Sequence, residues 1–225
     1  EEFGHIMRNV GAMSLHKLAT VIVRNTDSLL MSSFVGLLSV GYYSNYRLVL
    51  SGISNLVQKF SNAFAGSLGN LGAMEDEKRV YSIYRELDLI YFFIYSYWTA
   101  GLIALFNAFI TLCFGPQYCF SIVTVCIIVL EFYISGQRQV NLMFREAKGL
   151  FWYDRYKAIV EAAINLTVSL ALVQRFGVAG ILGGTVISSV CTCVWVEPYI
   201  LMRYGIRENW QEKLKDYFVK YIQRL

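Results

Sequence analysis

The fold is decided by residues 18–71, which read LATVIVRNTDSLLMSSFVGLLSVGYYSNYRLVLSGISNLVQKFSNAFAGSLGNL. Two apolar helices are predicted here, over residues 18–38 and 40–68, and both carry charged or amide side chains where a membrane helix normally has none. A charge near the centre of a bilayer costs about 3 kcal/mol on insertion scales, so such side chains normally face a bundle interior or a water-filled cavity. The stretch therefore predicts one wall of a polar lumen between membrane helices.

The spacing of the polar residues favours a shared face on each helix. Arg24 and Asp27 are three residues apart, so they lie on one side of the first helix, either as a proton or sodium site or as a self-neutralising ion pair. On the second helix the polar positions recur every three or four residues, which draws one stripe along it. The stripe consists of Arg47, Ser51, Asn55, Gln58 and Asn62, with Lys59 beside it.

Composition places the chain among multi-span membrane proteins. Of its 225 residues, 56% are hydrophobic and only 16% are charged, whereas a soluble domain is closer to a quarter charged. Residues 1–17 form a polar lead-in without a signal-peptide pattern, so the first helix is expected to serve as its own insertion signal. The five cysteines lie in or beside apolar runs, which indicates apolar filler of membrane helices rather than a metal site.

The apolar runs predict an all-α integral membrane bundle of six transmembrane helices. A tight turn is predicted at residues 41–46, a charged loop at 75–85, a basic loop at 145–157 and a very short turn at 175–177. Residues 203–225 are predicted to form an amphipathic tail. The predicted spans cover residues 18–38, 40–68, 87–114, 118–144, 158–173 and 178–201, lengths that roughly match the hydrocarbon thickness of a bilayer.

The distribution of basic residues predicts the orientation. Most of the 20 lysines and arginines fall in the lead-in, the loops at 75–85 and 145–157 and the tail, whereas only Arg47 and Arg175 fall on the opposite side. The positive-inside rule then places both termini in the cytoplasm. The outer loops are only a few residues long, and the sequence holds no nucleophile–base pair, phosphate loop or other catalytic motif. We therefore expect a protein that is not an enzyme and has no cofactor.

Polar residues also occur in the later spans. Glu131 lies deep in the fourth span and is predicted to face the cavity. Arg138, two turns further on, either faces the same cavity or marks the point where the helix leaves the membrane. Asn165 belongs to a polar line that repeats every four residues in the fifth span, and this line is either a second lumen wall or an interhelical hydrogen-bonding seam.

The sixth span carries two features that are read as structural. Gly180, Gly184 and Ser188 form a stripe of small residues, which indicates close helix packing rather than chemistry. Glu197 precedes Pro198, and this pair is predicted to end or kink the helix at the membrane face.

Several short segments carry a family resemblance in their order and spacing. They are HKL at 16–18, RNTDS at 24–28, VGYYSNY at 40–46, SLGNL at 67–71, GLFWYDRYK at 149–157, EAAINL at 161–166, GTVIS at 184–188 and WVEPY at 195–199. Together they resemble the bacterial polysaccharide transporter family, the Wzx-type oligosaccharide flippases. That family shares the MOP superfamily with MATE multidrug antiporters and the lipid II flippase.

The resemblance implies an architecture and an activity. Members of the family look like two six-helix halves related by a pseudo-twofold axis. This chain is similar to the second half only, so it is expected to be a fragment or to need a partner. The implied activity is the flipping of an undecaprenyl-diphosphate-linked oligosaccharide from the inner to the outer leaflet of the bacterial cytoplasmic membrane by alternating access. Asp27 or Glu131 is expected to couple this movement to H+ or Na+. Membrane lipids are expected partners and nucleic acid is not.

The residue types agree with such a substrate. Cations would offset the diphosphate charge, since arginine suits phosphate geometry, and amides would exchange hydrogen bonds with sugar hydroxyls. The cations are Arg24, Arg47, Lys59 and Arg138, and the amides are Asn55, Gln58, Asn62 and Asn165.

Three alternatives stay open at this point. A MATE-like antiporter of small organic cations would want a net acidic lumen, whereas these spans hold more cations than anions. A glycan-polymerising membrane enzyme would need a sizeable outer loop. A non-transporting scaffold subunit would use the polar stripes to bind a neighbouring protein.

Overall fold

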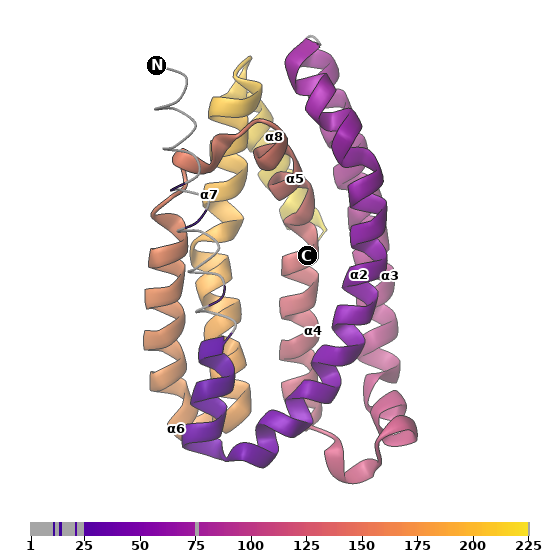
Figure 1. Cartoon of the computed structure of the whole chain (residues 1–225), viewed down its shortest axis with the longest axis vertical. Coiled ribbons are helices and arrows are strands. Elements are labelled where there is room, and N and C mark those ends of the chain that lie inside the picture. Colours follow the sequence, from indigo (N-terminus) through magenta and orange to yellow (C-terminus); the bar gives the residue numbers. More distant parts are fainter. Residues whose placement is uncertain (1–10, 12–13, 15–20, 22–24, 75–76, 225) are drawn as a thin grey trace.

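The computed structural model describes residues 11, 14, 21, 25–74 and 77–224 (Figure 1). Every regular element in these residues is a helix, which confirms the predicted all-α class. Most of the predicted lead-in, residues 1–17, and Arg24 lie outside the described residues.

The elements follow one another with short connections. After helical residues 25–30 come the π-helical turn η1 (Met31–Val35), α2 (Leu37–Met74), α3 (Glu77–Cys113), the 3-10 turn η2 (Pro116–Tyr118), α4 (Ile122–Gln137), α5 (Gln139–Ala147), the 3-10 turn η3 (Leu150–Trp152), α6 (Lys157–Cys191), α7 (Cys193–Ile200), the π-helical turn η4 (Leu201–Ile206) and α8 (Trp210–Gln223).

The long helices run roughly along the long axis of the molecule (Figure 1). Helix α3 packs on α4 and α4 packs on α6, while α2 contacts η1 at one end and α5 further along. Helix α6 is a hairpin rather than a rod, because Gly177 has φ 54° and ψ −128° and reverses the chain there. The reversal lies at the short turn predicted for residues 175–177.

Two segments of the described chain are long and apolar enough to cross a membrane. They are Glu77–Cys113, which is α3, and Lys157–Ile206, which comprises α6, α7 and η4. Length and composition alone support this statement, so the six-span arrangement stays a prediction.

The predicted turn at residues 41–46 is wrong. Helix α2 runs without interruption through these residues, and the chain turns earlier, at Gly36, where φ is 119°. The tyrosines there serve helix packing instead of an interfacial turn: Tyr46 is fully buried, and its hydroxyl donates to Asn107 Oδ1 of α3 at 2.5 Å. Glycine suits the Gly36 position because residues with a Cβ rarely adopt a positive φ.

The predicted loop at residues 75–85 is wrong from residue 77 onward. Helix α3 begins at Glu77, and its first turns bury Val80, Tyr84 and Leu87. Their spacing of three and four residues is that of a helical face. A glutamate in the first turn also suits the positive end of the helix dipole. The charged residues between them therefore form the outer face of a helix.

The amphipathic tail packs back along the bundle as α8. Tyr217 and Tyr221 are its buried residues, and Asn141 Nδ2 of α5 donates to the Tyr217 hydroxyl at 3.2 Å. Arg224, just after α8, pairs with Asp88 of α3 at 2.5 Å. The helix thus ties the start of α3 to α5.

The small-residue stripe of the sixth span is confirmed as a packing feature. A Cβ added at Gly180 would lie 2.5 Å from the Leu172 carbonyl oxygen, and one at Gly184 would lie 2.8 Å from the backbone nitrogen of Ser169. The two arms of the α6 hairpin therefore touch through their backbones at these glycines.

Gly184→Ala is expected to destabilise the protein by about 1–3 kcal/mol, because a methyl group has no room against the opposite arm. Thermal unfolding of the purified protein in detergent measures this. Gly183→Ala is the matched control, since a Cβ there meets nothing within 4 Å. Equal melting temperatures for the two variants would contradict the close approach.

Candidate functional site

The polar stripe on α2 is exposed along its length. The opposite side of the helix is buried through Tyr46, Leu50, Ile53 and Val57. Tyr46 stacks near Phe106 of α3 with ring centroids 4.8 Å apart, so this side faces the bundle. The predicted binding residues all lie on the exposed part of the helix: Arg47, Asn55, Gln58, Lys59 and Asn62.

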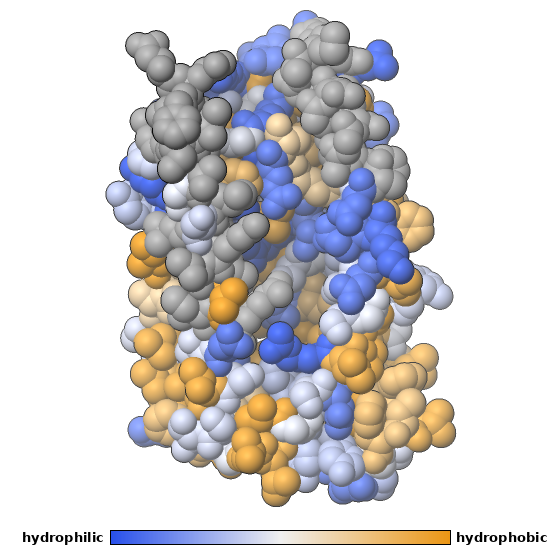
Figure 2. Space-filling view, in the orientation of Figure 1, coloured by the Kyte–Doolittle hydropathy of each residue, from blue (hydrophilic) through white to orange (hydrophobic). Residues whose placement is uncertain are grey.

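Hydrophilic side chains gather over the middle of α2 and border the recessed centre of the face shown in Figure 2. Lys59 lies one turn from both Asn55 and Asn62, so it joins the edge of the same stripe. Arg47 and Lys59 therefore belong to one exposed surface of one helix rather than to separate sides of the molecule. Arg24, the third predicted cation, is outside the described residues.

The cations of the stripe are not held in ion pairs within the part of the chain that the structure describes. No ion pair there involves Arg47 or Lys59. The Arg47 guanidinium lies 5.8 Å from the centroid of the Tyr43 ring. Gln58 Nε2 donates to Asn62 Oδ1 at 3.1 Å, which aligns the two amides. The stripe thus presents positive charge that no ion pair among the described residues neutralises, together with amide donors and acceptors.

A second polar group is buried between the first helix and the α6 hairpin. Asp27 is only 5% exposed, and the Thr185 hydroxyl lies 3.1 and 3.0 Å from its two carboxylate oxygens. Asn165 Nδ2 donates to Thr185 Oγ1 at 2.8 Å. The chain Asn165–Thr185–Asp27 therefore links both arms of the hairpin to the helix that precedes η1.

The buried group has spare oxygen capacity. Asn165 Oδ1 has no hydrogen-bond partner among the described residues. Glu131 and Arg47 both act electrostatically on the Asp27 carboxyl, and Glu131 accepts a hydrogen bond from Ser135 at 3.4 Å. Carboxylate, amide and hydroxyl oxygens in one buried place suit a hard cation, and a buried carboxylate can also hold a proton. No cluster of three His, Cys, Asp or Glu side chains occurs in the described ranges.

Arg138 is not a free cation of the lumen, and this expectation is corrected. Its Nη2 and Nε atoms donate to the two carboxylate oxygens of Glu197 at 2.7 and 3.0 Å. Lys157 Nζ contacts the same carboxylate, and the Lys157 and Glu197 side chains are almost completely buried. The charge of Arg138 is therefore held inside the protein by a paired network.

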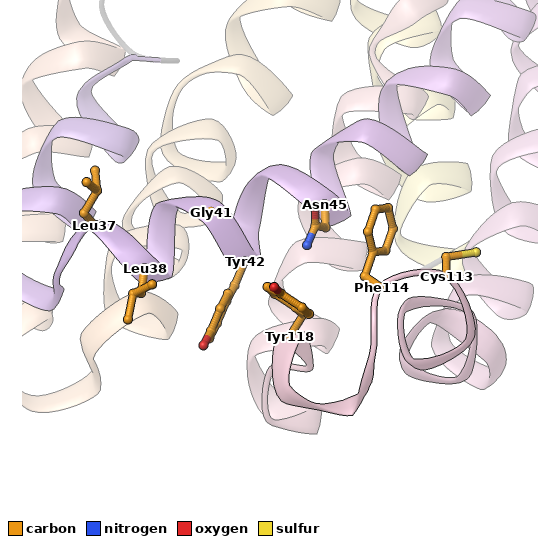
Figure 3. Close-up of a pocket in the computed structure, with 8 residues that line it drawn as sticks. All are labelled: Leu37, Leu38, Gly41, Tyr42, Asn45, Cys113, Phe114 and Tyr118. Carbon is orange, nitrogen blue, oxygen red and sulfur yellow. The ribbon is translucent and has the colours of Figure 1, made fainter.

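A pocket of about 530 Å³ opens near the start of α2 and the end of α3 (Figure 3). Apolar and aromatic side chains line most of it, including Leu37, Tyr42, Phe114 and Tyr118. The Tyr42 and Tyr118 rings meet edge to face at 5.2 Å. None of the predicted binding residues lines this pocket, so it is separate from both polar groups.

Sequence reasoning missed two residues of this arrangement. Thr185 is 158 residues from Asp27, and Glu197 is 59 residues from Arg138. No local pattern pairs residues so far apart. The only available signal was that each is a polar side chain in an apolar run.

Comparisons of the chain with protein-family models, curated proteins and solved structures give no match.

Proposed function

We propose that the chain forms one wall of a transport pathway that flips lipid-linked oligosaccharide repeat units across the bacterial cytoplasmic membrane. The observation that carries the proposal is the stripe of exposed cations and amides along α2, in a chain that is 56% hydrophobic. Such groups are costly against lipid and normally face water or a polar ligand.

The stripe fits the two polar parts of an undecaprenyl-diphosphate-linked glycan. Arg47 and Lys59 are exposed and form no ion pair among the described residues, so they can offset a diphosphate. Asn55, Gln58 and Asn62 offer donors and acceptors to sugar hydroxyls over the same length of helix. The prenyl chain stays in the lipid, because nothing in the stripe is apolar enough to replace it.

The proposed arrangement has six membrane spans with both termini in the cytoplasm. The stripe is open on the side away from α3, so the other wall of the lumen is to be supplied by a second six-helix unit, either an N-terminal half or a partner subunit. Rocking of one unit against the other then exposes the stripe to each side of the membrane in turn.

The buried group around Asp27 is the proposed coupling site for H+ or Na+. Asp27 lies on the first helix, whereas Thr185 and Asn165 lie on the two arms of the α6 hairpin. A proton or cation bound there changes the attraction between these elements. Because ion binding and the rocking movement are linked by a coupling free energy, this change can favour opening toward one side of the membrane over the other.

A MATE-like antiporter of small organic cations is the second candidate, favoured by the buried Asp27 with Glu131 acting on it. The cationic stripe on α2 argues against it, because like charges repel. Drug-accumulation assays in cells with and without the protein distinguish the two.

Arg47→Ala is expected to abolish surface polysaccharide in cells that depend on this protein, because the diphosphate loses its cation. Arg47→Lys, which keeps the charge but not the bidentate geometry, is expected to retain part of the activity. Surface polysaccharide is measured alongside the amount of protein in the membrane. Lys215→Ala, on the exposed face of α8, is the matched control. Normal polysaccharide with Arg47→Ala would count against the proposed role of the stripe.

A further inference from the structure

A group of basic and aromatic side chains gathers at one end of the molecule, around η3 and η4. We name it the basic–aromatic surface and define it by Lys148, Tyr153, Arg155, Arg203, Tyr204 and Arg207. Its centre is the stack of Tyr153 on Tyr204, with ring centroids 4.1 Å apart and planes 16° from parallel. This stack joins the segment after η3 to the π-helical turn η4.

Arg155, two residues after Tyr153, is held against two aromatic rings. Its guanidinium lies 3.9 Å from the centroid of the Trp152 ring and 4.5 Å from that of Tyr156. Its Nη1 atom also donates to the Trp152 carbonyl oxygen at 2.7 Å. Tyr156 is 62% exposed and Tyr153 is 50% exposed, while Arg155 and Trp152 are half-buried, so this group lies at the protein surface.

Arg203, which precedes Tyr204, is held in a similar way. Its guanidinium lies 5.3 to 5.7 Å from the ring centroids of Tyr204, Tyr199 and Trp210. Arg207 follows at the end of η4, where its Nε atom donates to the Tyr204 carbonyl oxygen at 3.2 Å. Both arginines are exposed. Aromatic faces thus fix the positions of Arg155 and Arg203 without neutralising them.

The surface carries a surplus of positive charge. No carboxylate forms an ion pair with Arg155, Arg203, Arg207 or Lys148 in the described ranges. Burial lowers the pKa of Lys148, the carboxylate of Glu77 raises it, and the positive charge of Arg207 lowers it. Lys148 therefore interacts electrostatically with Arg207. Two acids at this end, Glu77 and Glu208, have partners of their own: the backbone N–H of Glu208 donates to Glu77 Oε2 at 2.9 Å, and the Nζ atoms of Lys78 and Lys213 each lie 3.9 Å from a Glu208 carboxylate oxygen.

The position of the surface suits the edge of a bilayer. The segment Lys157–Ile206, which is apolar enough to cross a membrane, begins and ends beside it, and the segment Glu77–Cys113 begins nearby. Tyrosine and tryptophan concentrate at headgroup depth, and basic side chains there attract anionic lipids. Guanidinium groups also match the geometry of phosphate.

We propose that the basic–aromatic surface binds the phosphate headgroups of anionic phospholipids. The aromatic rings lie among the glycerol and upper acyl groups, while Arg155 and Arg203 hold phosphate oxygens. The proposal requires that α3 and the α6 hairpin cross a bilayer. It does not depend on what the chain transports.

Native mass spectrometry of the purified full chain in detergent tests this with dioleoyl phosphatidylglycerol as the probe and dioleoyl phosphatidylcholine as the neutral comparison. The wild type is expected to prefer phosphatidylglycerol. The double variant Arg155→Ala/Arg203→Ala is expected to bind it about tenfold or more weakly, since each surface cation contributes roughly 1 kcal/mol. Arg175→Ala/Lys215→Ala removes the same charge elsewhere and is expected to bind as the wild type does.

Three results would overturn the proposal. The first is equal binding of both lipids by the wild type. This comparison uses no variant, so the misfolding of a variant cannot explain it. The Arg155/Arg203 double variant could retain full phosphatidylglycerol affinity. Inorganic phosphate, added as a competitor, could bind as tightly as the lipid, which would make the surface a site for free anions. Transport is not read out here, so a failure of the proposed function leaves these results interpretable.

Discussion

Glu197→Ala is expected to destabilise the protein by about 3–5 kcal/mol, because it leaves two buried cations without their carboxylate. Glu197 forms ion pairs with Arg138, at the α4–α5 junction, and with Lys157, at the start of α6, and its own side chain is 1% exposed. The substitution therefore loosens three elements at once. Chemical or thermal unfolding in detergent measures the loss, and a reduced amount of protein in the membrane is expected to accompany it.

The charge explanation has its own controls. Glu146→Ala removes an exposed glutamate of α5 and is expected to change the stability by less than about 0.5 kcal/mol. Replacing Arg138, Lys157 and Glu197 together with methionine is expected to recover much of the stability, since an apolar group of similar volume avoids the desolvation penalty. If Glu197→Ala unfolds at the same temperature or denaturant concentration as the wild type, the network does not hold these helices together.

Asp27→Asn is expected to reduce ion-driven transport by about 5- to 150-fold, the usual range of coupling between two sites. The amide keeps the shape of the side chain, and its oxygen can still accept the hydrogen bond from Thr185, so the fold is expected to survive. It cannot carry the negative charge that attracts a cation or a proton. Export driven by an imposed pH or sodium gradient in membrane vesicles measures the effect.

The hydroxyl of Thr185 gives a second test of the coupling role of Asp27. Thr185→Val removes the hydroxyl that reaches Asp27, while Thr185→Ser keeps it, so the first is expected to weaken coupling and the second to preserve it. Asn25→Ala, at an exposed position two residues away, is the matched control. Transport by Asp27→Asn with an unchanged response to both gradients would remove Asp27 from the coupling mechanism.

Local sequence signals were sufficient for the helical class and for the face of α2. The recurrence of Arg47, Asn55, Gln58 and Asn62 at helical spacing predicts a shared side, and the structure places all four on the exposed side of one helix. The turn was misplaced because glycine and tyrosines at residues 41–46 have the composition of an interfacial turn. Burial of Tyr46 against α3, a tertiary effect, overrides that composition.

The buried networks could not be predicted from the sequence. Glu197 stands next to Pro198, and locally this pair indicates the end or a kink of a helix; α7 ends at Ile200 and the π-helical turn η4 follows directly. What defines Glu197 is its contact with Lys157, 40 residues earlier, and with Arg138. Asp27 likewise acquires its partner only when the α6 hairpin folds against the first helix. Pairings of this kind depend on helix packing, which single-sequence periodicity does not contain.

The orientation of α2 is the premise of the proposed transport pathway, and cysteine accessibility in native membranes tests it. In a background without the five native cysteines, Asn55→Cys, Gln58→Cys and Asn62→Cys are to be treated with a membrane-impermeant maleimide after the membranes have been opened to both sides. Leu56→Cys and Phe60→Cys are the matched pair, since these side chains are also exposed, at 54% and 65%, but lie off the stripe.

Rapid labelling of the three stripe positions, with little labelling of the two apolar positions, is the predicted result, because thiols react as thiolates and only in contact with water. Equal labelling of both sets, or labelling of the apolar set alone, would contradict a water-filled lumen along α2.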